Sequence, residues 1–390
     1  MTRWRILVFC GACLLIATGI LLWRLEDHDL DRRTHESFAF EANDARLAGT
    51  LWLPEDRAIA AVALVHGDGP QDRIAAGGYA PLINALLDAG LAVASWDKPG
   101  IGGSEGAWLD QSMEDRAVET SGALDALARR MEGIPRGALG FSQAGWVLPR
   151  LSSEEADFIA LVGPAVSWRD QGTYYTRIRL SRAGADAAEI ARSLAGAALE
   201  NERVFGRDAR FDPDVVPAEM GRARWAFIQR NREEDSQAYL GRLKIPTLAI
   251  WGQEDLNVDA ESNAAIYRGL LAGGHPANRI VIVPRATHGL LKESPYNSQL
   301  TSEWPWHTTL RFLWEGRSAY ARGALAQITD WITARTGAVA HPRRRSSARR
   351  ARPTGNPIVR SRTMPNETAN QNFGIAQRPN RAHRRAFESR

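Results

Sequence analysis

Short apolar runs and stretches of helical periodicity follow one another along most of this chain. Apolar runs of five to seven residues predict buried strands, and apolar positions three or four residues apart between them predict helices. The expected strands are residues 59–65, 91–96, 137–141, 158–162, 247–251 and 279–283, and the expected helices are residues 79–89, 112–131, 143–151, 260–271 and 318–334. Ahead of them, residues 37–41 and 47–53 alternate between apolar and polar on either side of Asn43-Asp44, which predicts an antiparallel hairpin.

This order of elements predicts an α/β fold. Strands that alternate with helices form a mostly parallel sheet with helices on both faces. Residues 166–242 interrupt the alternation with a helical period, and we interpret them as a helical insertion between two strands. The insertion contains aromatic residues that we expect to be packing residues rather than ligand contacts, namely Trp168, Tyr174, Tyr175, Trp225 and Phe227.

The N-terminal 34 residues form a separate segment. Residues 6–23 carry no charge, and as a helix they would span about 27 Å, close to the hydrocarbon thickness of a bilayer. Arg3 and Arg5 precede the run and acidic residues follow it, so the positive-inside rule places the N-terminus in the cytoplasm. We therefore expect a membrane anchor at residues 6–23, with the following domain periplasmic or otherwise extracytoplasmic. The alternative is a cleavable signal peptide with its site near Ala17-Thr18-Gly19, although four apolar residues follow that site.

The composition, 44% hydrophobic and 24% charged over 390 residues, excludes whole-chain disorder and collagen-like or coiled-coil architectures. The formal charge of +4 averages unlike parts, because residues 341–390 contain 13 Arg and 2 Glu and the remainder is net acidic. Periodicity ends before residues 339–390, and we expect a disordered basic tail there. This tail either binds anionic lipid or remains solvated without a specific partner. Nucleic acid is not expected as a partner.

Neither a metal nor another cofactor is expected. The two cysteines, Cys10 and Cys13, have a C-x-x-C spacing, but they lie inside the apolar run with no second pair and no nearby histidine. Glycines at 100 and 102 lack the third glycine of a dinucleotide-binding motif, since residue 105 is Glu. Phosphate-binding P-loop and zinc H-E-x-x-H motifs are absent from the sequence.

The central chemical motif is Gly140-Phe141-Ser142-Gln143-Ala144-Gly145, which follows an expected strand and opens an expected helix. A serine on such a sharp turn exposes its Oγ above the sheet edge, and its neighbours must be small because larger side chains would clash. Ala144 stands where glycine is usual in this motif. The alternative is that Ser142 caps the following helix.

Three further loops strengthen the catalytic interpretation. Residues 66–70, His-Gly-Asp-Gly-Pro, follow the first long buried strand and are typical of a loop whose backbone N–H groups bind an oxyanion, together with the N–H of Gln143. His66 itself is expected to be structural, because such a loop contributes through its backbone. Asp255 follows a later strand, at the edge where open α/β sheets bind ligands, and His288 follows the last strand.

Ser142, Asp255 and His288 together could perform nucleophilic catalysis. A serine hydroxyl is a poor nucleophile until a base accepts its proton, and His288 would be that base and later the acid that protonates the leaving group. Asp255 would fix the tautomer of the imidazole and stabilise its charged form. Glu254 and Asp259 are alternatives for the acid, and His275 and His307 are alternatives for the base. Of the three histidines, only His288 directly follows a strand.

These motifs together resemble the α/β-hydrolase superfamily. LAGTLWLP at 47–54 followed by HGDGPQDR at 66–73 is similar to bacterial esterases of the serine-aminopeptidase and prolyl-oligopeptidase-like branch. DKPGIGGS at 97–104 and GQEDLNV at 252–258 are similar to two further loops of that superfamily. The resemblance covers residues 36–338. The resemblance implies that Ser142 is the nucleophile, Asp255 the acid and His288 the base. It also implies that the backbone N–H groups of Asp68 and Gln143 bind the oxyanion.

Asp68 departs from the resemblance, since a small neutral residue is common at its position. A carboxylate aimed at a developing oxyanion would oppose it, so we expect the Asp68 side chain to point away.

We therefore expect an α/β-hydrolase domain over residues 35–338, with residues 166–242 as a helical cap. The expected reaction is hydrolysis of a small-molecule carboxylic ester through an acyl-enzyme. A peptidase or amidase of the same fold is the alternative, and it needs a site for a substrate amine, for which Glu233 and Glu234 are candidates. A non-catalytic binding protein on this scaffold is a further alternative, against which the intact serine, acid and histidine argue.

Overall fold

The computed structural model describes residues 13, 19–20, 24–217 and 220–336. The expected basic tail and nearly all of the apolar run at 6–23 lie outside these residues. Within the described part of the chain, no helix has both the length and the apolar character needed to cross a membrane.

An eight-stranded sheet forms the centre of the domain, in the spatial order β1-β2-β4-β3-β5-β6-β7-β8. β1 and β2 form the predicted hairpin, β2 is antiparallel to β4, and the remaining neighbours are parallel. Asn43 and Asp44 both have positive φ, as a two-residue hairpin turn requires. The predicted mostly parallel sheet is therefore confirmed. The strands are β1 (His35–Ala42), β2 (Ala45–Trp52), β3 (Ala60–Val65), β4 (Leu91–Trp96), β5 (Arg136–Phe141), β6 (Phe158–Val162), β7 (Thr247–Gly252) and β8 (Arg279–Val283).

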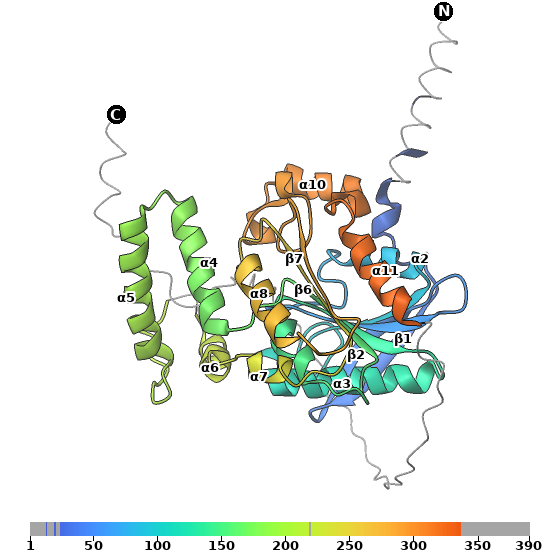
Figure 1. The fold of residues 1–390 in the computed structure, drawn as a ribbon, viewed down its shortest axis with the longest axis horizontal. Helices are drawn as coiled ribbons and strands as arrows, with labels where there is room; N and C mark the ends of the chain where they lie inside the picture. Colours follow the sequence, from blue (N-terminus) through green and yellow to red (C-terminus); the bar gives the residue numbers. More distant parts are fainter. Residues whose placement is uncertain (1–12, 14–18, 21–23, 218–219, 337–390) are drawn as a thin grey trace, which may run out of the picture.

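Helices cover both faces of the sheet (Figure 1). On one face, α3 (Met113–Arg130) and α8 (Ala260–Leu270) share a hydrophobic core with one set of strand side chains. On the other face, α2 (Ala80–Asp88) and α11 (Ala324–Thr336) pack against the alternate set. The central strands β3 and β4 are buried at every position, as expected for parallel strands covered on both sides.

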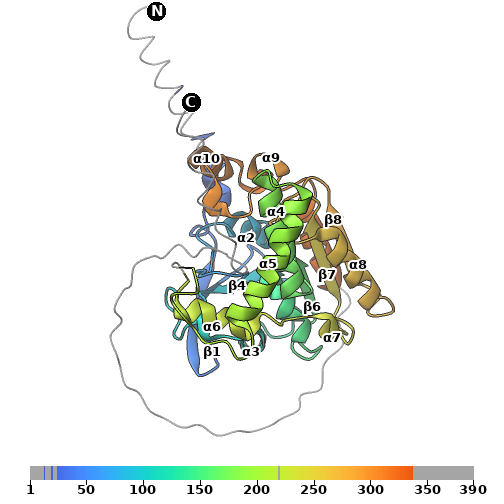
Figure 2. The same ribbon diagram turned by 90° about the vertical axis from the view of Figure 1, so that its left-hand side faces the viewer.

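Four helices lie between β6 and β7, in the segment expected to be an insertion: α4 (Trp168–Arg182), α5 (Ala187–Phe205), α6 (Arg222–Asn231) and α7 (Gln237–Leu240). Figure 2, turned so that this insertion faces the viewer, shows α4 and α5 standing in front of the sheet. Several of its aromatic residues are packing residues, as predicted. Trp168 stacks on Trp146 with 5.0 Å between ring centroids, and Trp225 Nε1 donates to the carbonyl of Val204. We refer to the insertion below as the cap.

Two predicted helices differ from the structure. Residues 143–151 form two 3₁₀ turns, η3 (Ser142–Trp146) and η4 (Leu148–Arg150), instead of one α-helix. Pro149 explains this difference, because proline has no N–H for the carbonyl four residues earlier and its ring clashes with that carbonyl. The last helix begins at Ala324 rather than at residue 318, since Gly323 has a φ of +77°, which a right-handed helix does not admit.

The structure also contains helices that the sequence pattern did not predict. The longest is α10 (Trp306–Glu315), which lies between the last strand and α11. The others are single turns: η1 (Glu26–His28), η2 (Trp108–Asp110), α9 (Glu293–Tyr296), η5 (Thr301–Glu303) and η6 (Gly316–Ala319).

Candidate active site

Ser142 lies at the turn after β5, where the backbone is strained. Its φ is +49°, in the left-handed region that serine seldom adopts. Small neighbours are a steric requirement of this turn. A Cβ added at Gly140 would lie 2.4 Å from Cβ of Ala144, and one added at Gly145 would lie 2.7 Å from Cβ of Pro164. This is the geometry of a nucleophile elbow, which lifts the serine side chain above the edge of the sheet.

Asp255 and His288 meet at the same edge, in the loops that follow β7 and β8. His288 Nδ1 lies 2.7 Å from Asp255 Oδ2, and the carboxylate is fully buried while the imidazole is 21% exposed. The backbone N–H groups of Asn257 and Val258 donate to Asp255 Oδ1 at 2.7 and 2.9 Å, which fixes the orientation of the carboxylate. Burial alone would lower the pKa of His288, but the charge and hydrogen bond of Asp255 outweigh it and raise that pKa.

The alternatives for the acid and the base have other contacts. Asp259 caps α8 by accepting a hydrogen bond from the backbone N–H of Ser262. His275 Nδ1 accepts from the backbone N–H of Ala277, at the turn before β8. Asp255 is therefore the carboxylate, among those considered, that pairs with a histidine at the sheet edge.

Gly163 brings His288 close to the turn that holds Ser142. β5 and β6 are paired in parallel with Phe141 opposite Val162, so Ser142 and Gly163 follow a matched pair of residues. The ring of His288 packs directly on Gly163, where an added Cβ would lie 2.8 Å from Cε1 and Nδ1. Glycine is needed here both for this contact and for a φ of +59°. The strand register thus places Ser142 beside Gly163, on which the imidazole packs.

The loop after β3, residues 66–70, lies on the other side of Ser142. A Cβ added at Gly67 would lie 3.6 Å from the Ser142 Cβ. Buried basic side chains bind the carbonyls of this loop. Lys98 Nζ donates to the carbonyls of Gly67 and Gly69 at 2.6 and 2.9 Å, and Arg116 Nη2 donates to the carbonyl of His66 at 2.6 Å. Because C=O and N–H point in opposite directions in a trans peptide, holding the Gly67 carbonyl also fixes the direction of the next N–H.

The Asp68 side chain forms an ion pair with the cap. Arg224 of α6 donates from Nη1 and Nη2 to its two oxygens at 3.0 and 2.6 Å, and Gln143 Nε2 donates to Oδ1 at 3.2 Å. Burial alone would raise the pKa of Asp68, but the charge and hydrogen bonds of Arg224 lower it to about 2. The carboxylate is therefore charged at neutral pH and matched by a cation.

His66 has the contacts of a structural residue. It is buried, its Nε2 lies 2.6 Å from the carbonyl of Trp96, and its ring stacks on Tyr79 at 5.6 Å. Burial, with the charge of Lys98, lowers its pKa to about 3, so it remains neutral over the whole physiological range. It holds the strand ends together rather than exchanging protons.

Sequence reasoning did not identify Lys98, Arg116 or Arg224. Arg116 had a recognisable signal, because it lies on the apolar stripe of α3 between Met113 and Thr120, where a charge requires a buried partner. Lys98 sits in a loop after β4, and its carbonyl partners are about thirty positions away in the sequence. Arg224 is one of many arginines in the cap, and its contact with Asp68 spans 156 residues. Sequence pattern alone does not select these two.

The cap also contacts the loop that holds Asp255. Tyr174 of α4 donates from its hydroxyl to the carbonyl of Asp255 at 2.8 Å, so this tyrosine is more than the packing residue that the sequence predicted. The cap contains a cavity of about 120 Å³ between α4, α5 and α6, but Ser142 and His288 do not line it. Among the described residues, no group of three or more His, Cys, Asp or Glu side chains is arranged to hold a metal ion.

Comparison with known proteins identifies a family of hydrolases. The family model described as "Serine aminopeptidase, S33" matches residues 56–295, more than half of the chain. The 2-hydroxy-6-oxo-6-phenylhexa-2,4-dienoate hydrolase of Burkholderia cepacia is 24% identical over 253 residues, which cover 58% of this chain and 81% of that enzyme.

Two solved structures superpose on this domain. A thermostable carboxyl esterase from Bacillus coagulans, in complex with glycerol, superposes with a TM-score of 0.50 and 16% identity, covering 78% of this chain and 99% of the esterase. The proline iminopeptidase of Mycobacterium smegmatis superposes with a TM-score of 0.47 and 16% identity, covering 78% of this chain and 99% of that enzyme. The esterase structure, at 16% identity, shows the α/β-hydrolase fold alone.

Proposed function

The chain belongs to the serine aminopeptidase family S33, and from this membership we propose that it is a serine hydrolase that cleaves carboxylic esters. Membership makes it a hydrolase of the α/β-hydrolase fold. The observation that carries the finer proposal is the 2.7 Å contact between His288 Nδ1 and Asp255 Oδ2, at the same sheet edge as Ser142. A carboxylate on Nδ1 keeps that nitrogen protonated and leaves Nε2 as the proton acceptor.

In the proposed reaction, Ser142 Oγ attacks the ester carbonyl carbon while His288 Nε2 accepts the hydroxyl proton. The tetrahedral intermediate then collapses, the bond to the alcohol oxygen breaks, and His288 returns the proton to that oxygen. Water attacks the acyl-enzyme in the same way, giving its proton to His288 and releasing the carboxylic acid. The proton finally returns to Ser142 Oγ, which restores the starting state.

The backbone N–H groups of Asp68 and Gln143 are the proposed donors to the oxyanion. Two features of the loop support this role. Lys98 fixes the Gly67 carbonyl, and with it the direction of the Asp68 N–H. Arg224 holds the Asp68 carboxylate in a two-bond ion pair, so its negative charge does not oppose the oxyanion. The cap thereby contributes a cation to a loop of the core.

Labelling with a fluorophosphonate probe tests the proposed nucleophile. The full-length protein in detergent should react, and Ser142→Ala should abolish the reaction, because the probe captures only an activated serine. Ser193→Ala is the matched control, since Ser193 is also a half-buried serine but lies on α5. Labelling that survives Ser142→Ala would reject the assignment.

Two carboxylates of the cap support the proposed preference for esters over amides. The two candidate carboxylates for a substrate amine are engaged by arginines, Glu233 by Arg169 and Glu234 by Arg150. A free aminoacyl terminus therefore finds no vacant carboxylate at these two positions. We expect p-nitrophenyl esters of short acids to be hydrolysed much faster than aminoacyl p-nitroanilides, and the opposite order would favour the peptidase alternative.

We also propose that residues 6–23 anchor the protein in a membrane, with the hydrolase domain on the extracytoplasmic side and the basic tail near anionic lipid. The support is the uncharged length of the run and the arginines before it. Carbonate extraction of membranes that contain the full chain should leave the protein in the pellet. Release into the supernatant, or a shortened N-terminus by mass spectrometry, would favour the cleaved signal peptide.

A further inference from the structure

Helix α10 presents its apolar side to solvent. Trp306, Leu310 and Trp314 are spaced four residues apart on one face, and they are 75%, 54% and 42% exposed. The opposite side of the helix faces the domain and carries the buried residues Thr308 and Phe312. A surface helix of a soluble domain normally has the reverse arrangement, with its apolar stripe against the core. Two exposed tryptophans on one stripe indicate a binding surface.

The described end of the N-terminal segment lies against this helix. The guanidinium of Arg24 sits 5.2 Å from the ring centroid of Trp314, and Arg24 directly follows the apolar run at 6–23. Four residues later, His28 packs edge-on against Phe312 at 5.1 Å, and its Nε2 lies 3.2 Å from the Phe312 carbonyl. The chain therefore leaves the apolar run beside the exposed face of α10.

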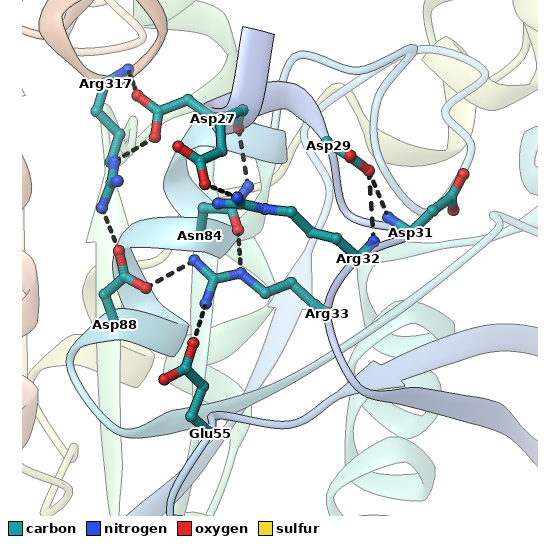
Figure 3. A network of polar contacts seen from close by, with 10 residues as sticks. Asp27, Asp29, Asp31, Arg32, Arg33, Glu55, Asn84, Asp88 and Arg317 are labelled. Carbon is teal, nitrogen blue, oxygen red and sulfur yellow. Dashed lines mark hydrogen bonds and ion pairs between the residues drawn. The ribbon is translucent and has the colours of Figure 1, made fainter. Parts of the chain in front are cut away.

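A network of ion pairs fastens this exit to the domain (Figure 3). Arg317, just after α10, donates from its backbone N–H and from Nε to the two oxygens of Asp27, at 2.9 and 2.6 Å. Asn84, which is fully buried, donates to the Asp27 carbonyl at 2.9 Å and accepts from Arg33 Nε at 2.7 Å. Asp88 pairs with both Arg33 and Arg317. We call this set of residues the exit clamp, and it holds η1 in a fixed position relative to α10.

We propose that the Trp306–Leu310–Trp314 face of α10 lies in the interfacial layer of the bilayer that residues 6–23 enter. The inference rests on the proposed membrane anchor and is independent of the proposed catalytic chemistry. Indole rings prefer the headgroup layer, where the ring is apolar and its N–H remains hydrated, and leucine enters the acyl boundary beside them. Arg24 stands at the depth where a cation meets lipid phosphates.

The exit clamp turns this apolar face into a fixed docking surface. A flexible linker would let the domain move away from the membrane, whereas the clamp keeps η1, and with it Arg24, beside α10. Once the anchor is inserted, docking of α10 is an intramolecular step with a high effective concentration. The partner is therefore a lipid surface, and a second copy of this chain is the competing occupant.

Depth measurement in vesicles tests the proposal. The full chain carries Cys10→Ser and Cys13→Ser together with Leu310→Cys, is labelled with a polarity-sensitive fluorophore, and is reconstituted into phosphatidylcholine–phosphatidylglycerol vesicles. The matched control carries Leu199→Cys instead, because Leu199 is 77% exposed on α5 of the cap. We expect brominated lipids to quench the label at position 310 several-fold more than the label at position 199.

Equal quenching at the two positions in protein that floats with the vesicles would overturn the docking and leave the anchor standing. A label at 310 that is shielded from water without being quenched by brominated lipid would assign the face to a second copy and also overturn it. Protein that fails to float with the vesicles would overturn both anchor and docking. Fluorophosphonate labelling of the same samples reports the catalytic proposal separately.

Discussion

Arg224 and Asp68 form a two-bond ion pair between the cap and the proposed oxyanion loop, with N–O distances of 3.0 and 2.6 Å. The Asp68 side chain is 3% exposed and that of Arg224 is 17% exposed, so the pair is shielded from water. The pair bears on the difficulty that the sequence raised at position 68, because the charge of the carboxylate is matched by an arginine.

Removing Arg224 should therefore harm both stability and catalysis. Arg224→Met leaves a buried carboxylate without its partner, which destabilises a protein by about 3 kcal/mol. We expect a fall of that size in the free energy of unfolding, measured with urea, and a drop in kcat for ester hydrolysis. Arg224→Met combined with Asp68→Asn should recover most of both losses, since no lone charge remains. If the double variant is as impaired as Arg224→Met, the charge argument is wrong.

The pair also has a defined pH dependence. The pKa of Asp68 is lowered to about 2, so its stabilising contribution is present above the ordinary aspartate pKa and is lost as the pH falls through that range toward 2. Asp68→Asn should remove this acid-sensitive part of the stability. Unfolding free energies of both proteins between pH 2 and pH 6 should converge at the acid end.

His288 should control the pH dependence of activity, and its pair with Asp255 should affect stability in the opposite sense to the Asp68 pair. Because Asp255 raises the pKa of His288, the histidine becomes a free base only above that raised value, and activity should decline as the pH falls below it. The stabilisation from this pair is present below the ordinary histidine pKa and is lost as the pH rises through the raised one. Asp255→Asn should shift the acid limb of the kcat/KM profile to lower pH and reduce kcat by roughly 10⁴-fold. If the acid limb of the kcat/KM profile does not shift in Asp255→Asn, the titrating group is not His288.

A side chain at Gly163 should reduce activity because it would displace the His288 ring, an effect that can be separated from the strain of a positive φ. Gly163→Ala places a Cβ 2.8 Å from the His288 ring and should reduce kcat by roughly a hundredfold, as small displacements of catalytic groups do. Gly184→Ala is the control, because Gly184 also has a positive φ (91°) but has open space around it. Both variants should lose about 1 kcal/mol of stability, and only the first should lose activity. Equal activities would show that His288 does not depend on this contact.

Lys98 should act as a positioning residue. Lys98→Met keeps the length of the side chain but releases the Gly67 and Gly69 carbonyls, so the Asp68 N–H loses its fixed direction. We expect kcat to fall roughly tenfold or more with KM little changed, as for a weakened oxyanion donor. Lys244→Met, at an exposed lysine before β7, serves as the control. A change in KM alone would place Lys98 in substrate binding instead.

Much of the fold was readable from local pattern. β4 and β6 match their predicted bounds because both are short apolar runs between turns. Helix α10 was missed because its exposed tryptophans and buried threonine reverse the usual amphipathic pattern. In the site, the turn that holds the serine and the residues that follow strands have recognisable sequence patterns. These patterns predicted Ser142, Asp255 and His288. Lys98 and Arg224 have none, because their partners are carbonyls and a carboxylate distant in sequence.

The exit clamp has a consequence for how the protein is made. Asp27 and Arg317 are separated by 290 residues, so the clamp closes a loop that contains nearly the whole domain. It cannot form until Arg317 has been synthesised, so η1 is fixed beside α10 only late in the synthesis of the domain. The position of η1, near the start of the described chain, is thus fixed by a residue near the end of the hydrolase domain.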